Sequence, residues 1–141
     1  MQTVDVRDTA GTRLDSGSTG KIINVGLWIL QIGAAGMFLM VGFLKLSGDQ
    51  QLVGLFEAIG LGQWFRYVTG SLEILGAVLL LIPGLSGLGA LLLVGVMLGA
   101  VATHLFVVGG SPLMAIILLV VTSVVAWGRR ERTMNIFAGL R

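Results

Sequence analysis

The sequence predicts an all-α integral membrane protein built as a four-helix transmembrane bundle. Of its 141 residues, 55% are hydrophobic and only 11% are charged, a composition too apolar for an ordinary soluble domain. Four apolar segments approach or exceed the length needed to cross a bilayer, which is roughly 20 residues, or about 17 for a short span. Two connections between these segments are very short, so the helices that they join pack as antiparallel neighbours. A soluble helical bundle would instead need polar outer faces.

The predicted helices cover about residues 22–44, 65–82, 85–108 and 112–127. The last three are joined by PGLS (83–86) and GGS (109–111). The two segments at 85–108 and 112–127 carry almost no polar side chains, which favours a lipid environment over water. Residues 21–130 therefore form one transmembrane domain.

The longest connection, about residues 46–64, alternates apolar and polar residues at helical spacing. Its apolar positions are Leu52, Leu55, Phe56 and Ile59. We expect a short helix that lies on or dips into the outer membrane surface and is broken by Gly60 and Gly62.

The two ends of the chain are polar. Residues 1–20 are rich in Thr, Ser, Gly and Asp and cannot bury a core, so we expect a disordered cytoplasmic tail. Residues 131–141 follow a basic stretch and are weakly amphipathic, which is typical of an anchor near anionic head groups.

Basic residues decide the predicted topology. An even number of spans puts both termini on one side, and seven of the nine Lys and Arg residues lie on that side. These seven are Arg7, Arg13, Lys21, Arg129, Arg130, Arg132 and Arg141. Lys45 and Arg66 lie on the other side. The positive-inside rule then places both termini in the cytoplasm and makes the chain a multi-pass protein of the inner (plasma) membrane. Such clustering at helix ends is not the pattern of a nucleic-acid-binding surface.

The second predicted helix carries its polar and small residues on one face. That face consists of Arg66, Thr69, Gly70, Glu73, Gly76 and Ala77. The first helix has a similar stripe of Asn24, Gln31, Ala35, Phe38, Gly42 and Lys45. We expect both stripes to face the bundle interior, because polar groups in a membrane avoid lipid. The Gly95–Gly99 pair on the third helix fits either packing within the chain or self-association.

Glu73, His104 and Lys45 fall in the outer half of the bundle. Glu73 lies roughly 12 Å and His104 roughly 6 Å from the outer ends of their helices, at 1.5 Å per residue, and Lys45 ends the first helix on that side. Lys45 or Arg66 would hold Glu73 ionised, because a nearby positive charge favours the charged form. The candidate ligand-binding residues are Lys45, Glu73, His104, Thr69, Thr103 and Arg66.

Structural roles compete with each of these assignments. Glu73 fits a helix-locking ion pair as well as a ligand or proton site, His104 fits a satisfied bundle histidine, and Lys45 fits snorkelling to the surface. The chain has no Cys and one His, which excludes thiolate chemistry, iron–sulfur ligation and a two-His haem within the chain. One Glu and one His give too few ligands for a metal site, and we assign no catalytic residue.

Several stretches resemble the DoxX-like family of small bacterial membrane proteins. They are FLMVGFLKLSG (38–48), FEAIGLGQWFRYVTGSLEILGAVLLLIP (56–83), GALLLVGVMLGAVATHL (89–105) and GGSP (109–112). The most specific pieces are Lys45-Leu46, Tyr67 with Thr69-Gly70 and Glu73, and Thr103-His104-Leu105. The resemblance covers about residues 22–130. Gly60-Leu61-Gly62 departs from the Gly-Leu-Pro that family members often carry there.

The resemblance implies a four-helix membrane bundle and a link to quinone-coupled sulfur oxidation, with redox partners for some relatives. A eukaryotic relative acts as an assembly chaperone for receptors. We therefore expect an accessory subunit of a quinone-linked membrane redox system that binds a lipophile, with quinone as the candidate cofactor. The alternative is a structural or assembly subunit of a larger membrane complex, and a small transporter or proton path is a third class. Expected partners are membrane lipids, other membrane proteins and a second copy of the chain, but not nucleic acid.

Overall fold

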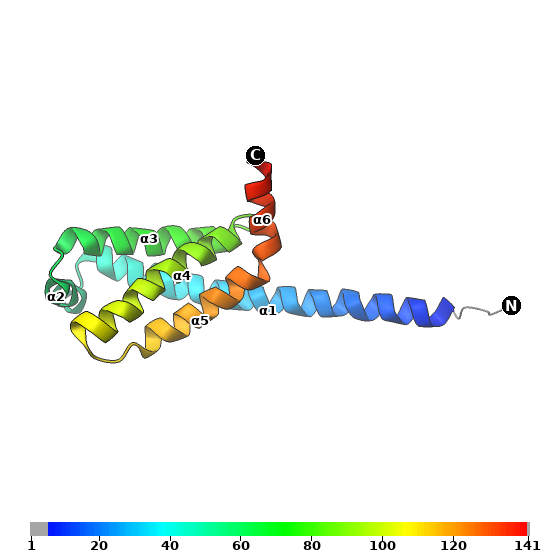
Figure 1. The fold of residues 1–141 in the computed structure, drawn as a ribbon, viewed down its shortest axis with the longest axis horizontal. Coiled ribbons are helices and arrows are strands. Elements are labelled where there is room, and N and C mark those ends of the chain that lie inside the picture. Colours follow the sequence, from blue (N-terminus) through cyan, green and yellow to red (C-terminus); the bar gives the residue numbers. More distant parts are fainter. Residues whose placement is uncertain (1–5, 141) are drawn as a thin grey trace.

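The computed structural model describes the backbone of residues 6–140 and the side chains from Gly17 onward, and these residues form helices without strands (Figure 1). The elements are α1 (Val6–Ser47), α2 (Gln50–Ile59), α3 (Gln63–Leu81), α4 (Ser86–Thr103), the π-helical turn η1 (His104–Val108), α5 (Leu113–Gly128) and α6 (Arg130–Gly139). α1, α3, α4 and α5 run side by side as a bundle, with α2 at one end and α6 leaving from the other (Figure 1). The all-α bundle predicted from the sequence is confirmed.

Three described helical stretches are long and apolar enough to cross a membrane: Gly17–Ser47, Gln63–Leu81 and Ser86–Val108. α5 has 16 residues, and α6 continues from it only after a bend of 60°. At 1.5 Å per residue α5 is about 24 Å long, slightly short of the roughly 30 Å hydrocarbon core. α5 packs against α4 along the bundle. Its two ends each lie one residue after the ends predicted for the fourth segment, 112–127.

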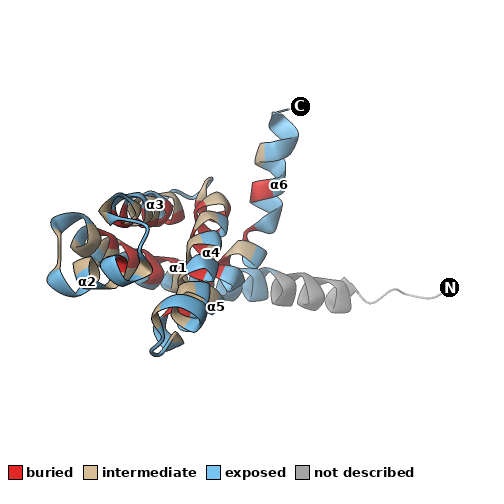
Figure 2. Ribbon diagram, turned by 60° about the vertical axis from the view of Figure 1, so that its left-hand side comes forward, coloured by how far each residue is buried: buried red, intermediate tan, exposed pale blue. Residues whose placement is uncertain are grey.

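The bundle packs around a small apolar core. Its buried members are Leu80, Leu93, Phe38, Val125, Met97, Leu118 and the alanines Ala34, Ala35, Ala77, Ala90 and Ala115. Long apolar side chains such as Ile29, Phe43 and Leu98 are exposed, and the described parts of α1, α3, α4 and α5 each have both buried and exposed residues (Figure 2). Apolar side chains thus lie both in the core and on the outside, which suits a protein surrounded by hydrocarbon, where helix association depends on close packing rather than on hiding apolar surface.

Glycines allow the closest helix contacts. A Cβ at Gly42 would lie 2.7 Å from Ile74 Cγ1, and a Cβ at Gly89 would lie 2.8 Å from the backbone oxygen of Gly76. α1 therefore meets α3, and α3 meets α4, nearly backbone to backbone. The predicted inward stripe of α3 is confirmed, because Arg66, Glu73 and the small residues near them are buried; Thr69 is only half-buried.

The first helix is longer than predicted. α1 begins at Val6, so the expectation of a disordered tail over residues 1–20 is wrong from Val6 onward, and residues 1–5 lie outside the described residues. The polar composition disfavours helix nucleation, but the segment contains no proline and continues an apolar helix that already exists. Extending a formed helix by one residue is much easier than starting a new one.

The loop helix α2 is close to the prediction. Asp49 caps its first turn by accepting hydrogen bonds from the backbone N–H groups of Gln51 and Leu52. Gly60 and Gly62 have φ angles of 82° and 99°, a region that favours glycine. Proline at position 62 could not adopt that angle, so the departure from Gly-Leu-Pro goes with a different turn.

The end of the helix predicted at 85–108 and the C-terminal segment both differ from the sequence-based prediction. The predicted continuous helix at 85–108 changes to π-helical geometry at His104. The C-terminal segment forms the separate helix α6, of which residues up to Leu140 are described. Its predicted role as an interfacial anchor stays a prediction.

Candidate functional site

An ion pair joins the end of α1 to the middle of α3. Lys45 Nζ lies 2.6 Å from Glu73 Oε1, and the two side chains are 11% and 1% exposed. Gly70, one turn before Glu73, lets the backbone of α3 approach Lys45, since a Cβ there would lie 3.0 Å from Lys45 Cβ. Of the two partners that the sequence offered for Glu73, Lys45 is the one that the structure selects.

Arg66 has a different role from the one considered for it. Its guanidinium donates hydrogen bonds to the backbone oxygen of Lys45 and to Gln63 Oε1, the latter at 2.7 Å. It also stacks over the Tyr67 ring at 4.4 Å from the ring centre. Arg66 thereby satisfies a carbonyl in the last turn of α1, which helix ends leave without an internal donor.

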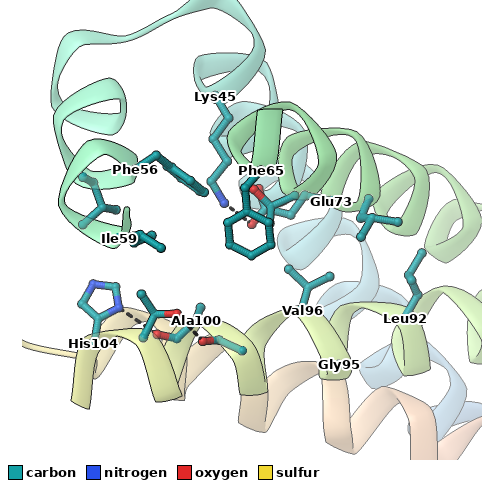
Figure 3. Close-up of a pocket in the computed structure, with 15 residues that line it drawn as sticks. Lys45, Phe56, Ile59, Phe65, Glu73, Leu92, Gly95, Val96, Ala100 and His104 are labelled. Carbon is teal, nitrogen blue, oxygen red and sulfur yellow. Dashed lines mark hydrogen bonds and ion pairs between the residues drawn. The ribbon is translucent and has the colours of Figure 1, made fainter. Parts of the chain in front are cut away.

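A pocket of about 430 Å³ opens beside the ion pair, at the end of the bundle covered by α2 (Figure 3). Its walls come from α1, α2, α3, α4 and the first residue of η1. The lining residues are Lys45, Leu55, Phe56, Ile59, Phe65, Thr69, Leu72, Glu73, Leu92, Gly95, Val96, Gly99, Ala100, Thr103 and His104. Five of the six predicted site residues line it, and Arg66 does not.

Two glycines of α4 leave room for this pocket. A Cβ at Gly95 or Gly99 would meet no atom within 4 Å. Both residues line the pocket, so the Gly95–Gly99 pair makes no close helix contact within the described chain. Of the two interpretations that the sequence left open, intrachain packing is therefore wrong.

His104 stands across the pocket from the ion pair (Figure 3). Its Nδ1 lies 2.9 Å from the backbone oxygen of Ala100, one turn earlier. No hydrogen bond joins His104 to Lys45 or Glu73, so the three groups share one pocket without forming the contact that the sequence allowed. The ring sits where α4 gives way to π-helical geometry, a local widening that often occurs at functional sites.

The two predicted threonines direct their hydroxyl hydrogens to their own helices. Thr69 Oγ1 donates to the Arg66 backbone oxygen at 3.1 Å, and Thr103 Oγ1 donates to that of Gly99 at 2.8 Å. Glu73 Oε2, in contrast, is buried and has no hydrogen-bond partner. The pocket is thus an apolar chamber with a few polar groups, of which this carboxylate oxygen is unsatisfied.

Sequence reasoning missed a second polar cluster, at the opposite end of the bundle, in which Gln31 and Arg129 are buried and Asn24 is exposed. Arg129 Nε donates to Gln31 Oε1 at 2.9 Å, and its Nη1 donates to Asn24 Oδ1 at 2.8 Å. Gln31 Nε2 in turn donates to the Leu80 backbone oxygen at 2.8 Å. Asn24 and Gln31 stood in the predicted polar stripe of α1, but their partner is about a hundred residues away in the sequence and was read only as a topology signal.

Comparison with known proteins identifies one relationship. A model of the DoxX-like family matches residues 29–128, which include the ion pair and all of the pocket walls. Searches of curated proteins and of solved structures gave no match. The matched region covers well over half of the chain, and the family resemblance seen in the Lys45, Glu73 and His104 motifs is confirmed. The chain belongs to the DoxX-like family of membrane proteins.

Proposed function

We propose that the protein binds a lipophilic, quinone-like molecule in the pocket beside Lys45 and Glu73 and serves as a non-catalytic accessory subunit of a membrane redox system. The observation that carries the proposal is an apolar pocket of about 430 Å³ with a buried ion pair and a histidine in its walls. Small-molecule sites are typically about 300–1,000 Å³ and combine apolar walls with a few polar groups. The redox context follows from what the family resemblance implies.

The setting proposed for this function is the bacterial inner membrane. The pocket lies at the α2 end of the bundle, which the positive-inside rule assigns to the outer side. A lipophile would enter from the surrounding lipid, and a redox partner protein would supply the electron-transfer chemistry that this chain's residues do not provide.

The first test is to purify the protein from native membranes and extract bound lipophiles. Gly95→Leu should fill the pocket without disturbing helix packing, because no atom lies near the position of its Cβ. Gly36→Leu is the matched control, since Gly36 is equally open but lies outside the pocket. We expect a quinone or its hydroquinone to copurify with the wild type and Gly36→Leu and to be lost from Gly95→Leu.

Thermal unfolding provides a second measurement. A ligand present at 100 times its Kd stabilises the native state by about 2.7 kcal/mol. Added quinone or quinol should therefore raise the Tm of the wild type and of Gly36→Leu, but not of Gly95→Leu. If nothing copurifies and neither compound raises the Tm, the binding function is wrong.

A structural or assembly role is the second candidate, and a specific contact favours it. The Lys45–Glu73 pair and the Arg66 bond to the Lys45 carbonyl both tie α1 to α3, as a register lock would. Under this alternative, Glu73→Gln and His104→Gln should impair folding or complex assembly without changing any ligand binding. Intact assembly in both variants would exclude it.

A further inference from the structure

Most hydrogen-bond donors in the pocket walls already bind acceptors within the protein. The groups that remain available to a ligand are mostly hydrogen-bond acceptors. The hydroxyl hydrogens of Thr69 and Thr103 are donated to carbonyls of their own helices. Each hydroxyl oxygen can still accept a hydrogen bond but has no hydrogen left to give. The two threonines therefore offer a ligand acceptors only.

His104 is also left as an acceptor. A backbone carbonyl can only accept, so the 2.9 Å contact with Ala100 requires the hydrogen to be on Nδ1. In the neutral ring, Nε2 then carries no hydrogen and presents a lone pair. The hydrogen bond to the Ala100 oxygen therefore fixes the tautomer of the neutral ring and leaves Nε2 as a hydrogen-bond acceptor for a ligand.

Glu73 gives the same polarity on the opposite side. Its Oε1 is occupied by Lys45 Nζ at 2.6 Å, whereas Oε2 is buried without a partner. An ionised carboxylate accepts hydrogen bonds and cannot donate them. Buried polar atoms are almost always satisfied by protein or by ordered water, so an unpaired acceptor beside a pocket is open to a donor from outside the chain.

Lys45 is the one donor in this set. Its ammonium has three hydrogens, and one is directed to Glu73 Oε1. A hydroxyl group placed at this end would accept from Lys45 Nζ and donate to Glu73 Oε2. A carbonyl oxygen could accept from Lys45 but would leave Oε2 unpaired.

We infer that the pocket is built for a hydroquinone, a ring with two hydroxyl groups, in preference to its oxidised carbonyl form. One ring hydroxyl would meet Lys45 and Glu73, and a second donor would meet His104 Nε2 across the apolar walls. This inference rests on the proposed function and specifies its ligand: the subunit holds the reduced lipophile. No redox step is assigned to the protein itself.

The test compares three ligands that share one ring and one short alkyl tail: the hydroquinone, its quinone and its dimethyl ether. Binding is measured under anaerobic conditions on the purified full chain. We expect the hydroquinone to bind at least about tenfold more tightly than the quinone, equivalent to one unmet polar interaction. The ether, which keeps the shape but has no donor, should bind no better than the quinone.

Variants locate the preference. Glu73→Gln supplies an amide donor in place of the lone acceptor, so the hydroquinone-to-quinone affinity ratio should fall toward one. Glu57→Gln makes the same chemical change at an exposed position outside the pocket and should keep the wild-type ratio. Should Glu73→Gln fail to fold, His104→Phe removes the other acceptor and should also lower the ratio.

The outcomes separate this inference from the function on which it rests. Equal or tighter binding of the quinone overturns the inference but leaves a lipophile-binding pocket. An unchanged ratio in a folded Glu73→Gln or His104→Phe variant also overturns it, because the preference would arise elsewhere. Failure of all three ligands to bind overturns both.

Discussion

Glu73 is a buried carboxylate whose only partner in the described part of the chain is Lys45. Removing two charges from water is costly, and a buried pair recovers that cost only when its geometry is good and its remaining atoms are satisfied. Here one carboxylate oxygen is unsatisfied, so the pair is poorly designed for stability alone. This imbalance supports the proposed ligand-binding role of the pair.

A mutant cycle tests the energetics of the pair. Lys45→Met should destabilise the protein by about 3–5 kcal/mol, because it leaves the Glu73 carboxylate buried without a countercharge. The double variant Lys45→Met/Glu73→Leu should be clearly more stable than Lys45→Met, since it removes both charges. The measurement is reversible unfolding in detergent micelles for the wild type, both single variants and the double variant.

The test depends on whether the double variant is more stable than the two single variants together predict, and not on the size of the difference in unfolding free energy. If the double variant is as unstable as the sum of the two single variants, the charges do not interact, and the pair is not the coupling between α1 and α3. Glu57→Gln, an exposed carboxylate change on α2, controls for a general effect of lost charge.

The α5–α6 corner is the clearest case of one element being positioned by another. Arg129, 5% exposed, ties the corner to α1 through Gln31 and Asn24. Thr133 is buried in the next turn, where a Cβ at Gly87 of α4 would lie 1.8 Å from its hydroxyl oxygen. Arg132 also donates to the Pro83 backbone oxygen at 3.0 Å. These contacts hold α6 at 60° to α5, so that it leaves the bundle sideways (Figure 1).

This direction predicts that α6 lies in the inner membrane surface. Phe137 and Leu140 are exposed and share the half of the helix that contains buried Thr133, whereas Glu131 and Asn135 lie on the opposite half. Exposed Arg130 and Arg132 favour anionic head groups. The outward apolar side chains would then contact acyl chains beyond the edge of the bundle.

Spin labels can test this placement, because the chain has no native cysteine. Phe137→Cys and Asn135→Cys put labels on opposite faces of α6, about 200° apart. In vesicles containing anionic lipid, the label at 137 should be accessible to oxygen and the label at 135 to a water-soluble nickel complex. Two equally water-accessible labels would show that α6 stands away from the membrane.

Element positions were largely predictable from the sequence, but the pocket was not. Hydropathy and the short turns located three of the helices closely, and the polar stripe of α3 identified its buried face. The pocket depends on Gly95 and Gly99, which sequence reasoning treated as candidates for helix contact. A glycine pattern shows where side chains are absent. Whether a helix or a cavity occupies that space depends on where α2 lies, and here it packs on α3 and η1 and leaves the pocket between itself and α4.

Hydrogen bonds between polar residues far apart in the sequence could not be predicted either. Asn24, Gln31 and Arg129 were each visible as polar residues in the inner half of the predicted bundle. Nothing in the spacing of α1 shows that a guanidinium from the end of α5 reaches its buried face. The length of α1 was underestimated for another reason, because composition describes an isolated segment and ignores the apolar helix that it extends.

At the scale of the whole molecule, the basic residues are divided unequally between the two ends of the bundle. α6 lies at one end of the bundle, whereas α2 and the turn between η1 and α5 lie at the other (Figure 1). The sequence assigns seven Lys and Arg residues to the side of the two termini, and only Lys45 and Arg66 to the α2 side. Both of these two are engaged within the protein, Lys45 with Glu73 and Arg66 with the Lys45 carbonyl.

We therefore predict that both termini are cytoplasmic and that α2 faces outward, because basic loops are retained on the cytoplasmic side. Gln51→Cys on α2 and Asn135→Cys on α6 are both at exposed positions of the cysteine-free chain. In bacterial spheroplasts, a membrane-impermeant maleimide should label Gln51→Cys at once and Asn135→Cys only after permeabilisation. Labelling of Asn135→Cys in intact spheroplasts would reverse the orientation. The pocket would then open toward the cytoplasmic half of the membrane, and any redox partner would have to approach from that side.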